Sequence, residues 1–283
     1  MTTLQSQALL FRSLHVPGRP LVLPNAWDVV SARLVEEAGA AAVATTSAGT
    51  AWALGSPDGH QVDRAGVLDL VARITAAVRV PVTVDVEDGF AADPEGVAET
   101  VRGVLAAGAV GINLEDGLRS GPTPLRPIAE QAERIAAARA AAEAAGVPLY
   151  LNARVDAHRL PDAGSAHWLA ETLARATAYL AAGADGVFLL GTHAPATVTA
   201  LVEGIAAPLN LAAGPGTPSV AELAALGAAR ISAGSSIAEA AYAVVARAAR
   251  ELLTEGTSAA LAGGLPYGTL NALLADRQHP AQS

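Results

Sequence analysis

Acidic side chains recur at the ends of two apolar segments of this 283-residue chain. Asp85 and Glu87 lie two residues apart in VTVDVEDG, and Glu115 lies near the end of VGINLEDG. Residues two apart on a strand share a face, so we expect Asp85 and Glu87 to point the same way and Glu115 to meet them from the next strand. Such carboxylates repel one another unless protons or a cation neutralise them. Because oxygen ligands favour hard ions, the pattern predicts a Mg2+ site, with Mn2+ as a possible substitute.

Each carboxylate taken alone has a simpler explanation. Asp85 or Glu115 can cap the helix that follows it, or can pair with Arg154. The three together favour a metal site over these separate roles. The chain has no histidine pair with the spacing of a zinc site, which disfavours zinc.

Arg154 in LYLNARVD is the candidate for holding an anionic substrate, because a guanidinium forks onto a carboxylate or phosphonate. Its alternative role is a structural bridge to Asp85 or Asp156. The small residues Ser47, Ala48 and Gly49 offer a hydroxyl and backbone N–H groups, which suit an anion.

Other candidates carry weaker signals. Asp58 in GSPDG is equally well explained as an ordinary turn residue. His158 and His193 follow strand ends and suit proton transfer, but solvated loop histidines explain them better. Further polar residues at the strand ends are Asn25, Asp28, Thr46, Asp88, Asn113, Asp116, Asn152, Asp156 and Asn210, of which Asn210 is assigned to substrate binding.

Two residue types are missing from the chain. It contains no cysteine, and its 18 Lys-plus-Arg residues are all arginine. The first absence excludes a disulfide, a thiolate nucleophile, Cys-ligated zinc and an iron–sulfur cluster. The second excludes Schiff-base catalysis, pyridoxal phosphate attachment and a Walker-type lysine. A carbonyl substrate must therefore be activated by a metal or by hydrogen bonds.

The charge and hydropathy of the chain argue against two classes of partner, nucleic acids and membranes. A formal net charge of -9 with 16% charged residues is unlike the basic surface of a nucleic-acid binder. The chain has no uncharged apolar run of about 20 residues, and its start lacks a basic segment followed by a hydrophobic one. We therefore expect a cytoplasmic protein whose partner is a small anion, rather than nucleic acid or a membrane.

The residues above must be positioned by eight short apolar segments rich in β-branched residues, separated by stretches with helical periodicity. Each glycine before a segment is expected to adopt the left-handed conformation just past a helix, and each proline blocks helix continuation. The entrances alternate between the two residue types: Pro20, Gly39, Pro81, Gly108, Pro148, Gly183, Pro208 and Gly227. The chain is thus predicted to contain four βαβα units.

Apolar strands alternating with helices indicate a parallel sheet covered by helices, and eight strands close into an α/β (β/α)8 TIM barrel. A doubly wound open sheet is the alternative, but no segment is followed by GxGxxG. We predict one domain over residues 1–283. A helix over 236–255 can close the barrel, and a surplus helix over 257–276 lies in a C-terminal extension, 257–283.

The motifs PNAWD, TTSAG, LGSPDG, VDVEDGF, INLEDG and NARVDA occur in this order and resemble the isocitrate lyase and phosphoenolpyruvate mutase superfamily. The resemblance is greatest to its shorter branch, which is methylisocitrate lyase-like and carboxyphosphonoenolpyruvate phosphonomutase-like, and it covers about residues 8–240. It implies a Mg2+-dependent barrel whose last helix is swapped between the subunits of a homodimer or homotetramer.

The resemblance also implies roles for individual residues. Asp85 is similar to the direct metal ligand, and Asp58, Glu87 and Glu115 to the residues that hold its waters. Ser47, Ala48 and Gly49 resemble the segment that grips the substrate carboxylate, and Arg154 resembles the substrate-binding arginine. The shared chemistry is formation of a metal-stabilised enolate of a 2-oxo acid as a C–C or P–C bond breaks.

The chain departs from the family on the loop that carries its acid/base. Lyases have a Lys-Lys-Cys-Gly-His motif there and mutases have a lysine, but residues 117–124 contain neither, and Arg119 is their only cation. Leu190 stands where relatives have a glutamate or histidine. Standard isocitrate or methylisocitrate cleavage is therefore not expected, whereas a decarboxylase or hydrolase needs less, because water can protonate the enolate.

Three functional hypotheses follow. The first is a Mg2+-dependent lyase that cleaves a C–C bond, by retro-aldol reaction or decarboxylation, in a small 2-oxo or 2-hydroxy carboxylate, with Asp58, Arg154 and Arg119 as catalytic candidates. The second is a phosphonomutase or phosphonopyruvate hydrolase that acts on a P–C bond. The third is a barrel that binds a metabolite without catalysis, which the missing loop acid suggests.

Overall fold

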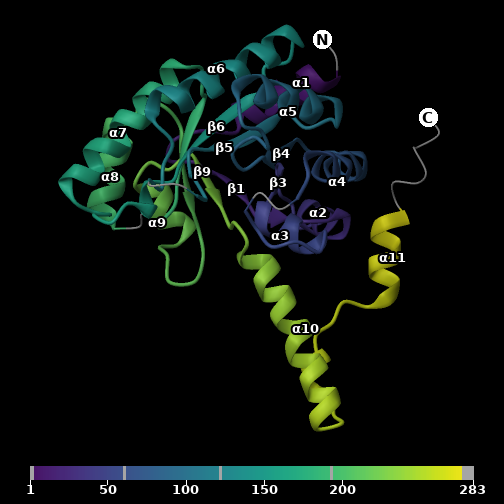
Figure 1. Cartoon of the computed structure of the whole chain (residues 1–283). Coiled ribbons are helices and arrows are strands. Elements are labelled where there is room, and N and C mark those ends of the chain that lie inside the picture. Colours follow the sequence, from purple (N-terminus) through teal and green to yellow (C-terminus); the bar gives the residue numbers. More distant parts are fainter. Residues whose placement is uncertain (1–2, 60–61, 121–122, 192–193, 276–283) are drawn as a thin grey trace.

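The computed structural model describes residues 3–59, 62–120, 123–191 and 194–275 (Figure 1). These residues form a parallel sheet in the order β1-β9-β8-β7-β6-β5-β4-β3-β2. The two strands at the ends of this order, β1 and β2, follow each other in the chain and are separated only by Pro24, so the sheet curls into a nearly closed barrel. The predicted TIM barrel is confirmed. Its strands are β1 (Leu21–Leu23), β2 (Asn25–Ala26), β3 (Val43–Thr45), β4 (Val82–Asp85), β5 (Gly111–Glu115), β6 (Tyr150–Val155), β7 (Gly186–Leu189), β8 (Leu209–Ala212) and β9 (Arg230–Ser232).

The first predicted segment is divided in two. Proline has no backbone N–H to give to a strand ladder, and Pro24 separates β1, which pairs with β9, from β2, which pairs with β3. The seam of the barrel therefore lies at this residue.

Helices connect and cover the strands (Figure 1). The predicted helix-ending glycines Gly39, Gly108, Gly183 and Gly227 have φ angles of 93°, 88°, 108° and 96°, as expected for left-handed residues. The helices up to β9 are α1 (Thr3–Ser13), α2 (Val29–Glu37), α3 (Ser47–Ala53), α4 (Arg64–Ala77), α5 (Pro94–Ala106), α6 (Ile128–Ala144), η1 (Ala157–Arg159), α7 (Ala166–Ala181), α8 (Pro195–Gly204) and α9 (Val220–Ala225).

The barrel has an apolar shell and a polar interior. Apolar side chains such as Val84, Ile112, Leu151 and Leu211 are buried in the main hydrophobic core. Polar strand residues are buried as well, and the strand register brings them together in pairs: Asn113 with Asn152, and Asn210 with Arg230. This polar layer crosses the barrel below the ends of the strands.

The C-terminal segment differs from the prediction. Helix α10 (Ser236–Thr254) was expected to close the barrel, but it projects away from it and buries only Ala238 and Ala248 (Figure 1). The predicted helix over 257–276 is not continuous, because Gly263 has a φ angle of 82° and Pro266 cannot continue a helix. Instead, η2 (Ala259–Leu261) contacts α10, and α11 (Tyr267–Ala275) packs against α2. Asp276, the predicted end of the helix, lies outside the described residues.

No helix in the described part of the chain has the length and apolar character required to cross a bilayer.

Candidate active site

A small cavity lies where the carboxyl ends of the strands converge. Its volume is about 180 Å3, which suits only a small ligand. Contributions come from strands or strand ends on opposite sides of the barrel, as expected for a TIM-barrel site. The lining residues are Asn25, Thr46, Ser47, Ala48, Asp58, Asp85, Asn113, Arg154, Phe188, Leu190, Ser232, Gly234 and Ser235.

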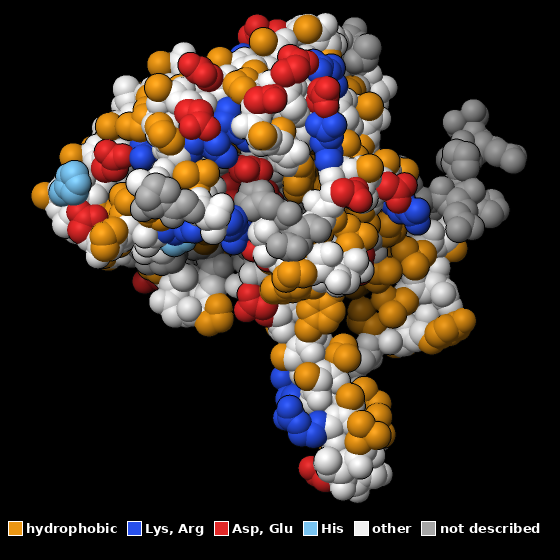
Figure 2. Space-filling model, viewed as in Figure 1, with side chains coloured by type: hydrophobic (Ala, Val, Ile, Leu, Met, Phe, Trp, Pro, Cys, Tyr) orange, Lys and Arg blue, Asp and Glu red, His pale blue; other side chains and the backbone are white. Residues whose placement is uncertain are grey.

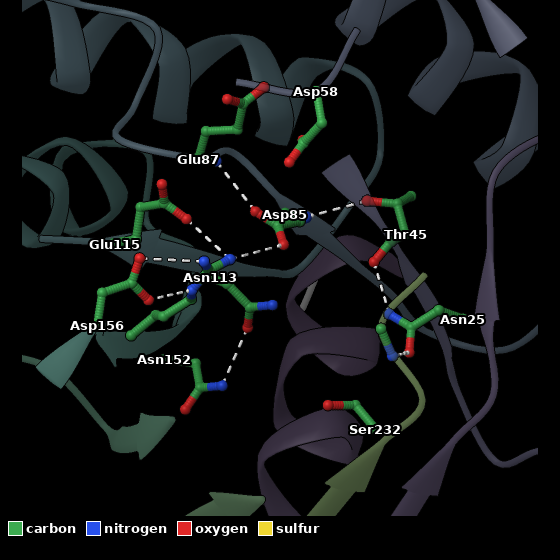
Figure 3. Close-up of polar contacts among 12 residues, drawn as sticks. Asn25, Thr45, Asp58, Asp85, Glu87, Asn113, Glu115, Asn152, Asp156 and Ser232 are labelled. Carbon is green, nitrogen blue, oxygen red and sulfur yellow. Dashed lines mark hydrogen bonds and ion pairs between the residues drawn. The ribbon is translucent and has the colours of Figure 1, made fainter. Parts of the chain in front are cut away.

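Asp85 is the last residue of β4 and faces this cavity. Its backbone N–H donates to Oγ1 of Thr45 at 3.0 Å, and its Oδ1 accepts from the backbone N–H of Glu87 at 3.0 Å (Figure 3). Burial raises the pKa of Asp85, while the nearby Arg154 guanidinium opposes that shift. The carboxylate is therefore held in a fixed place where a further cation would favour its ionised form.

Glu87 reaches the site differently from the prediction. It lies beyond β4 and has a φ angle of 50°, so strand alternation does not explain its orientation. Its carbonyl accepts from the backbone N–H of Glu115 at 2.8 Å, and its side chain lies on the same side of Asp85 as Asp58 (Figure 3). Phe90, in the same loop, has a φ angle of 51°. Left-handed conformations of such residues are uncommon and tend to cluster at functional sites.

Glu115 is the most deeply buried of the predicted metal-site carboxylates, with 1% of its side chain exposed. Its Oε2 lies 2.8 Å from Nη1 of Arg154, and its Oε1 lies 3.8 Å from Nη2 of Arg119. Burial raises the pKa of Glu115 to about 8, and the charge of Arg154 acts against this rise. The proton affinity of Glu115 thus depends on the cations around it.

Arg154 lies among three carboxylates. Its Nε and Nη2 donate to Oδ1 and Oδ2 of Asp156 at 2.7 and 3.1 Å. Nη1 also lies 3.8 Å from Oδ2 of Asp85. Burial disfavours its charge, but the surrounding carboxylates of Glu115, Asp156 and Asp85 outweigh burial and raise the pKa of Arg154. The structural bridge considered in the sequence analysis is therefore present, and it leaves Nη1 as the nitrogen directed to the acidic pair.

Arg119, on the loop after β5, lies at the entrance of the same cavity. Its Nη2 lies 3.4 Å from Oδ2 of Asp58, which precedes α4. Asp58 and Arg119 keep 31% and 40% of their side chains exposed, so this ion pair lies at the entrance. Gly117 allows the loop to lie close to β6, because a Cβ there would be 2.5 Å from Oδ2 of Asp156. Residues 121–122 of the loop lie outside the described residues.

The arrangement of the acidic residues suits a cation that keeps most of its waters better than one bound directly by several carboxylates. Among residues 3–59, 62–120, 123–191 and 194–275, no three acidic or histidine side chains form a compact chelating cluster. However, Oδ1 of Asp58 and Oε1 of Glu115 are buried without a hydrogen bond in this part of the chain, and Oε2 of Glu115 has only its ion pair with Arg154. Mg2+ usually keeps several waters and binds one or two carboxylates directly. The donor set therefore fits a Mg2+ ion bound by Asp85 whose waters contact the other carboxylates.

The predicted anion-binding segment forms the first turn of α3. Ser47 and Ala48 line the cavity, and the N–H groups of a first helical turn have no acceptor within the helix. Gly49 has a packing role, because a Cβ there would be 2.8 Å from both Thr46 and Trp27 side chains. Of the three predicted residues, two face the cavity and one allows the helix to approach its neighbours.

Several other candidates lie away from the cavity. The Asn210 amide donates to the Leu211 carbonyl and accepts from Asn152, so its placement does not support the predicted substrate contact. Asp28 caps α2 by accepting from the Ser31 N–H at 2.7 Å. His158 lines a separate cavity near Gly191, and burial lowers the pKa of His158. His193 lies outside the described residues.

Several cavity-lining residues had no role in the sequence-based predictions. Asn113 is two residues before Glu115 on β5, and its amide reaches the cavity. The same alternation that was applied to the acidic residues places Asn113 on the face of Glu115. Ser232 at the end of β9 is another lining residue that had no assigned role.

Comparison with known proteins identifies relatives along most of the chain. Residues 11–253 match the phosphoenolpyruvate phosphomutase family. A Mycobacterium tuberculosis protein is 36% identical over 95% of this chain and 97% of its own. The 2-methylisocitrate lyase of Salmonella typhimurium is 32% identical over 66% of this chain and 63% of its own. An oxaloacetate decarboxylase of Bradyrhizobium is 28% identical over 75% of this chain and 73% of its own.

Solved structures show the same barrel. A Burkholderia cenocepacia protein described as a lyase or mutase superimposes with a TM-score of 0.89 and 39% identity, over 96% of each chain. Oxaloacetate acetylhydrolase superimposes with a TM-score of 0.85 and 26% identity, over 96% of this chain and 94% of its own.

Proposed function

Because the chain belongs to the phosphoenolpyruvate phosphomutase family, within the superfamily of phosphoenolpyruvate mutases and isocitrate lyases, we propose that it is a Mg2+-dependent carbon–carbon lyase. Its substrate is a small 2-oxo or 2-hydroxy carboxylate. The observation that carries this proposal is the buried pairing of Arg154 with Glu115 at 2.8 Å, next to Asp85 in a small cavity. A bound cation would balance the carboxylates of Asp85 and Glu115, and an anionic substrate would interact with the cation and with Arg154.

The proposed roles follow from position. Asp85 holds the ion, and Asp58, Glu87 and Glu115 accept hydrogen bonds from its waters. Ser47 and Ala48 bind the substrate carboxylate at the first turn of α3. Arg154 binds a second anionic group through Nη1, which Asp156 does not hold and which lies 2.8 Å from Glu115 at the edge of the cavity. The ion, when bound, stabilises the negative charge that develops on the substrate oxygen as the bond breaks.

Decarboxylation and retro-aldol cleavage differ in whether they need a side chain that donates a proton. The chain has no cysteine and no lysine, so residues 117–124 of the loop after β5 offer only Arg119 as a cation. Loss of CO2 leaves an enolate that water can protonate, and this needs no side-chain acid. An oxaloacetate decarboxylase and an oxaloacetate acetylhydrolase are among the similar proteins, which supports oxaloacetate or a close analogue as the first substrate to test.

Cleavage of a P–C bond is the second candidate function. It is favoured by the match to the phosphomutase family and by Arg119, which stands on the loop where mutases have a lysine. Arg119 lies 3.4 Å from Asp58 and suits a phosphonate oxygen at the entrance.

One assay distinguishes these functions. The purified protein is incubated with Mg2+ and, in separate reactions, with oxaloacetate, methylisocitrate, dimethylmalate and phosphonopyruvate. Pyruvate, glyoxylate, CO2 and phosphate are measured separately, with EDTA as control. Metal-dependent CO2 from oxaloacetate, or pyruvate from methylisocitrate or dimethylmalate, supports the lyase, whereas phosphate or phosphoenolpyruvate formed from phosphonopyruvate supports P–C chemistry. Tight substrate binding without any product supports a barrel that binds a metabolite and lacks catalysis.

We also propose that the chain assembles as a homodimer or homotetramer through its C-terminal arm, residues 236–275. Apolar side chains lie along one side of the projecting helix (Figure 2). The exposed fraction reaches 63% for Val245, 86% for Leu253 and 85% for Tyr267. Apolar surface of this kind marks an interaction site, and a second copy of the chain offers the same surface in return.

A further inference from the structure

The interior of the barrel contains a cation that the proposed function does not use. Arg230 on β9 is 1% exposed and makes no ion pair with any residue in the described ranges. Its Nη2 donates to Oδ1 of Asn113 at 3.1 Å, while its Nε and Nη1 have no hydrogen-bond partner in the same part of the chain. A buried guanidinium without a carboxylate is costly to maintain, so its single strong contact requires an explanation.

That contact determines the orientation of the Asn113 amide. Oδ1 of Asn113 accepts from Nη2 of Arg230 and also from Nδ2 of Asn152 at 3.0 Å. Because this atom of Asn113 receives hydrogen bonds from two donors, it must be the amide oxygen. The hydrogen bonds therefore determine which end of the amide is oxygen and which is nitrogen. The Asn113 nitrogen is then left to face the cavity, toward the space bordered by Asp85, Asn25 and Ser232 (Figure 3).

The neighbouring amides do not share this property. The Asn25 nitrogen donates to the Thr45 carbonyl at 2.8 Å, and its oxygen accepts from the N–H groups of Ala233 and Gly234, each at 2.9 Å. Asn25 therefore uses its oxygen and one of its two amide N–H groups to join β2 to its neighbours. Among the amides that line the cavity in the described residues, Asn113 is the one that keeps both N–H donors available.

We propose that Nδ2 of Asn113 donates a hydrogen bond to an oxygen of the bound carboxylate substrate, and that Arg230 is a positioning residue that holds Asn113 in this orientation. The inference rests on the proposed function for the substrate class, a small dianionic or trianionic acid. The guanidinium polarises the amide through Oδ1, which strengthens the donor on the opposite side.

Binding of oxalate in the presence of Mg2+, measured by isothermal titration calorimetry, tests this proposal without relying on turnover. Asn113→Asp keeps the shape of the side chain and gives Arg230 a carboxylate partner, but it removes the N–H donor. We expect unchanged or higher thermal stability together with oxalate binding weakened by about a hundredfold. Asn271→Ala, on exposed α11, is the control and should bind oxalate like the unmodified protein.

A double-mutant cycle tests the role of Arg230. Asn113→Ala should weaken oxalate binding by about tenfold or more, and Arg230→Met by about three- to tenfold. If Arg230 acts through Asn113, the double variant binds no more weakly than Asn113→Ala alone. Losses that multiply would show that Arg230 acts independently and would overturn its positioning role. If Arg230→Met does not fold, Arg230→Lys replaces it, and this variant should retain binding to within about threefold because it keeps a donor.

The outcomes separate this inference from the proposed function. Oxalate binding that is unaffected by Asn113→Asp, or no oxalate binding by the unmodified protein, overturns the inference. Oxalate binding that requires Asn113, in a protein that turns over none of the candidate acids, supports the inference and counts against the lyase.

Discussion

Nε of Arg154 lies 2.7 Å from Oδ1 of Asp156, and Nη2 lies 3.1 Å from Oδ2 of the same carboxylate. This two-bond contact fixes the plane of the guanidinium before a substrate arrives. It is the arrangement in which an arginine is most strongly oriented by a carboxylate. Asp156 is held in turn, since its backbone N–H donates to Oδ1 of Asp116 at 2.8 Å.

Asp156→Asn should lower kcat/KM by about ten- to a hundredfold, because one of the two charge-assisted bonds to Arg154 is lost. The change should appear mainly in KM, since Arg154 is proposed to bind substrate. Steady-state kinetics with the substrate found in the product screen provides the measurement. Asp69→Asn, on the exposed face of α4, is the matched control. Equal effects of the two substitutions would contradict a special role for Asp156.

Asp85→Ala should remove metal-dependent turnover, with a loss of about a thousandfold or more, because the proposed direct ligand is absent. Mn2+ binding, followed by electron paramagnetic resonance, should weaken in parallel. Asp69→Ala controls for loss of an acidic residue elsewhere. Unchanged Mn2+ affinity in Asp85→Ala would place the ion on other residues.

Arg119→Ala should lower activity by about tenfold, whereas Arg119→Lys should retain most of it, because a cation at the entrance is preserved. The physical basis is its contact with Asp58 at 3.4 Å and with Glu115 at 3.8 Å. Activities of both variants are compared at saturating Mg2+. If alanine and lysine have the same effect, the charge of Arg119 is not what matters.

His15 should make the fold sensitive to acid. Burial is the main cause that lowers the pKa of His15 from 6.5 to about 3, and the ring stacks on Tyr150 with centroids 3.8 Å apart. Because the folded-state pKa is lowered, the unfolded chain binds the proton first. Stability is complete above about pH 6.5 and decreases as the pH falls toward 3. Between pH 7.5 and 5, this one residue should lower the free energy of unfolding by about 2 kcal/mol.

Urea unfolding at pH 7.5, 6 and 5 measures this effect. His15→Phe keeps a ring on Tyr150 and cannot be protonated, so its stability should depend less on pH over this interval, even if it is lower at pH 7.5. His167→Phe, at an exposed position on α7, should keep the full dependence. The same slope in His15→Phe as in the unmodified protein would mean that other groups dominate acid unfolding.

Leu253→Asp should dissociate the proposed oligomer, because it puts a charge on the apolar side of α10, where Leu253 is 86% exposed in the single chain. Thr254→Asp adds the same charge four residues after Arg250, on the polar side of the helix, and should leave assembly intact. Molar mass is measured by size-exclusion chromatography with light scattering. A monomeric unmodified protein would exclude assembly through the arm.

Much of the fold was predictable from local sequence. Alternating glycine and proline entrances and β-branched segments predicted the barrel, and the left-handed glycines confirm the helix ends. The C-terminal arm was not predictable in the same way, because α10 carries an apolar stripe whether it covers its own barrel or meets another chain. Periodicity shows that a face is apolar, and only packing shows what covers it.

The candidate site was predicted in part. Strand ends led to Asp85, Glu115, Arg154 and Ser47, and all four line or border the cavity. Glu87 was predicted to share a strand face with Asp85, but this argument was wrong, because Glu87 has a φ angle of 50° and lies beyond the end of the strand. Asn210 and Asn113 look alike in sequence, as each is an asparagine on a buried strand, yet only Asn113 faces the cavity.

The sequence by itself determined the barrel, the acidic mouth and the absence of cysteine and lysine chemistry, since these depend on residue types and on spacings of a few positions. The tertiary structure alone decided which polar groups have hydrogen-bonding capacity left for a ligand. The reason is that the decisive contacts span long separations: Asn113 meets Asn152, 39 residues away, and Arg230, 117 residues away. A local sequence pattern cannot show that the acceptor oxygen of a side chain is satisfied by a strand on the opposite side of the barrel.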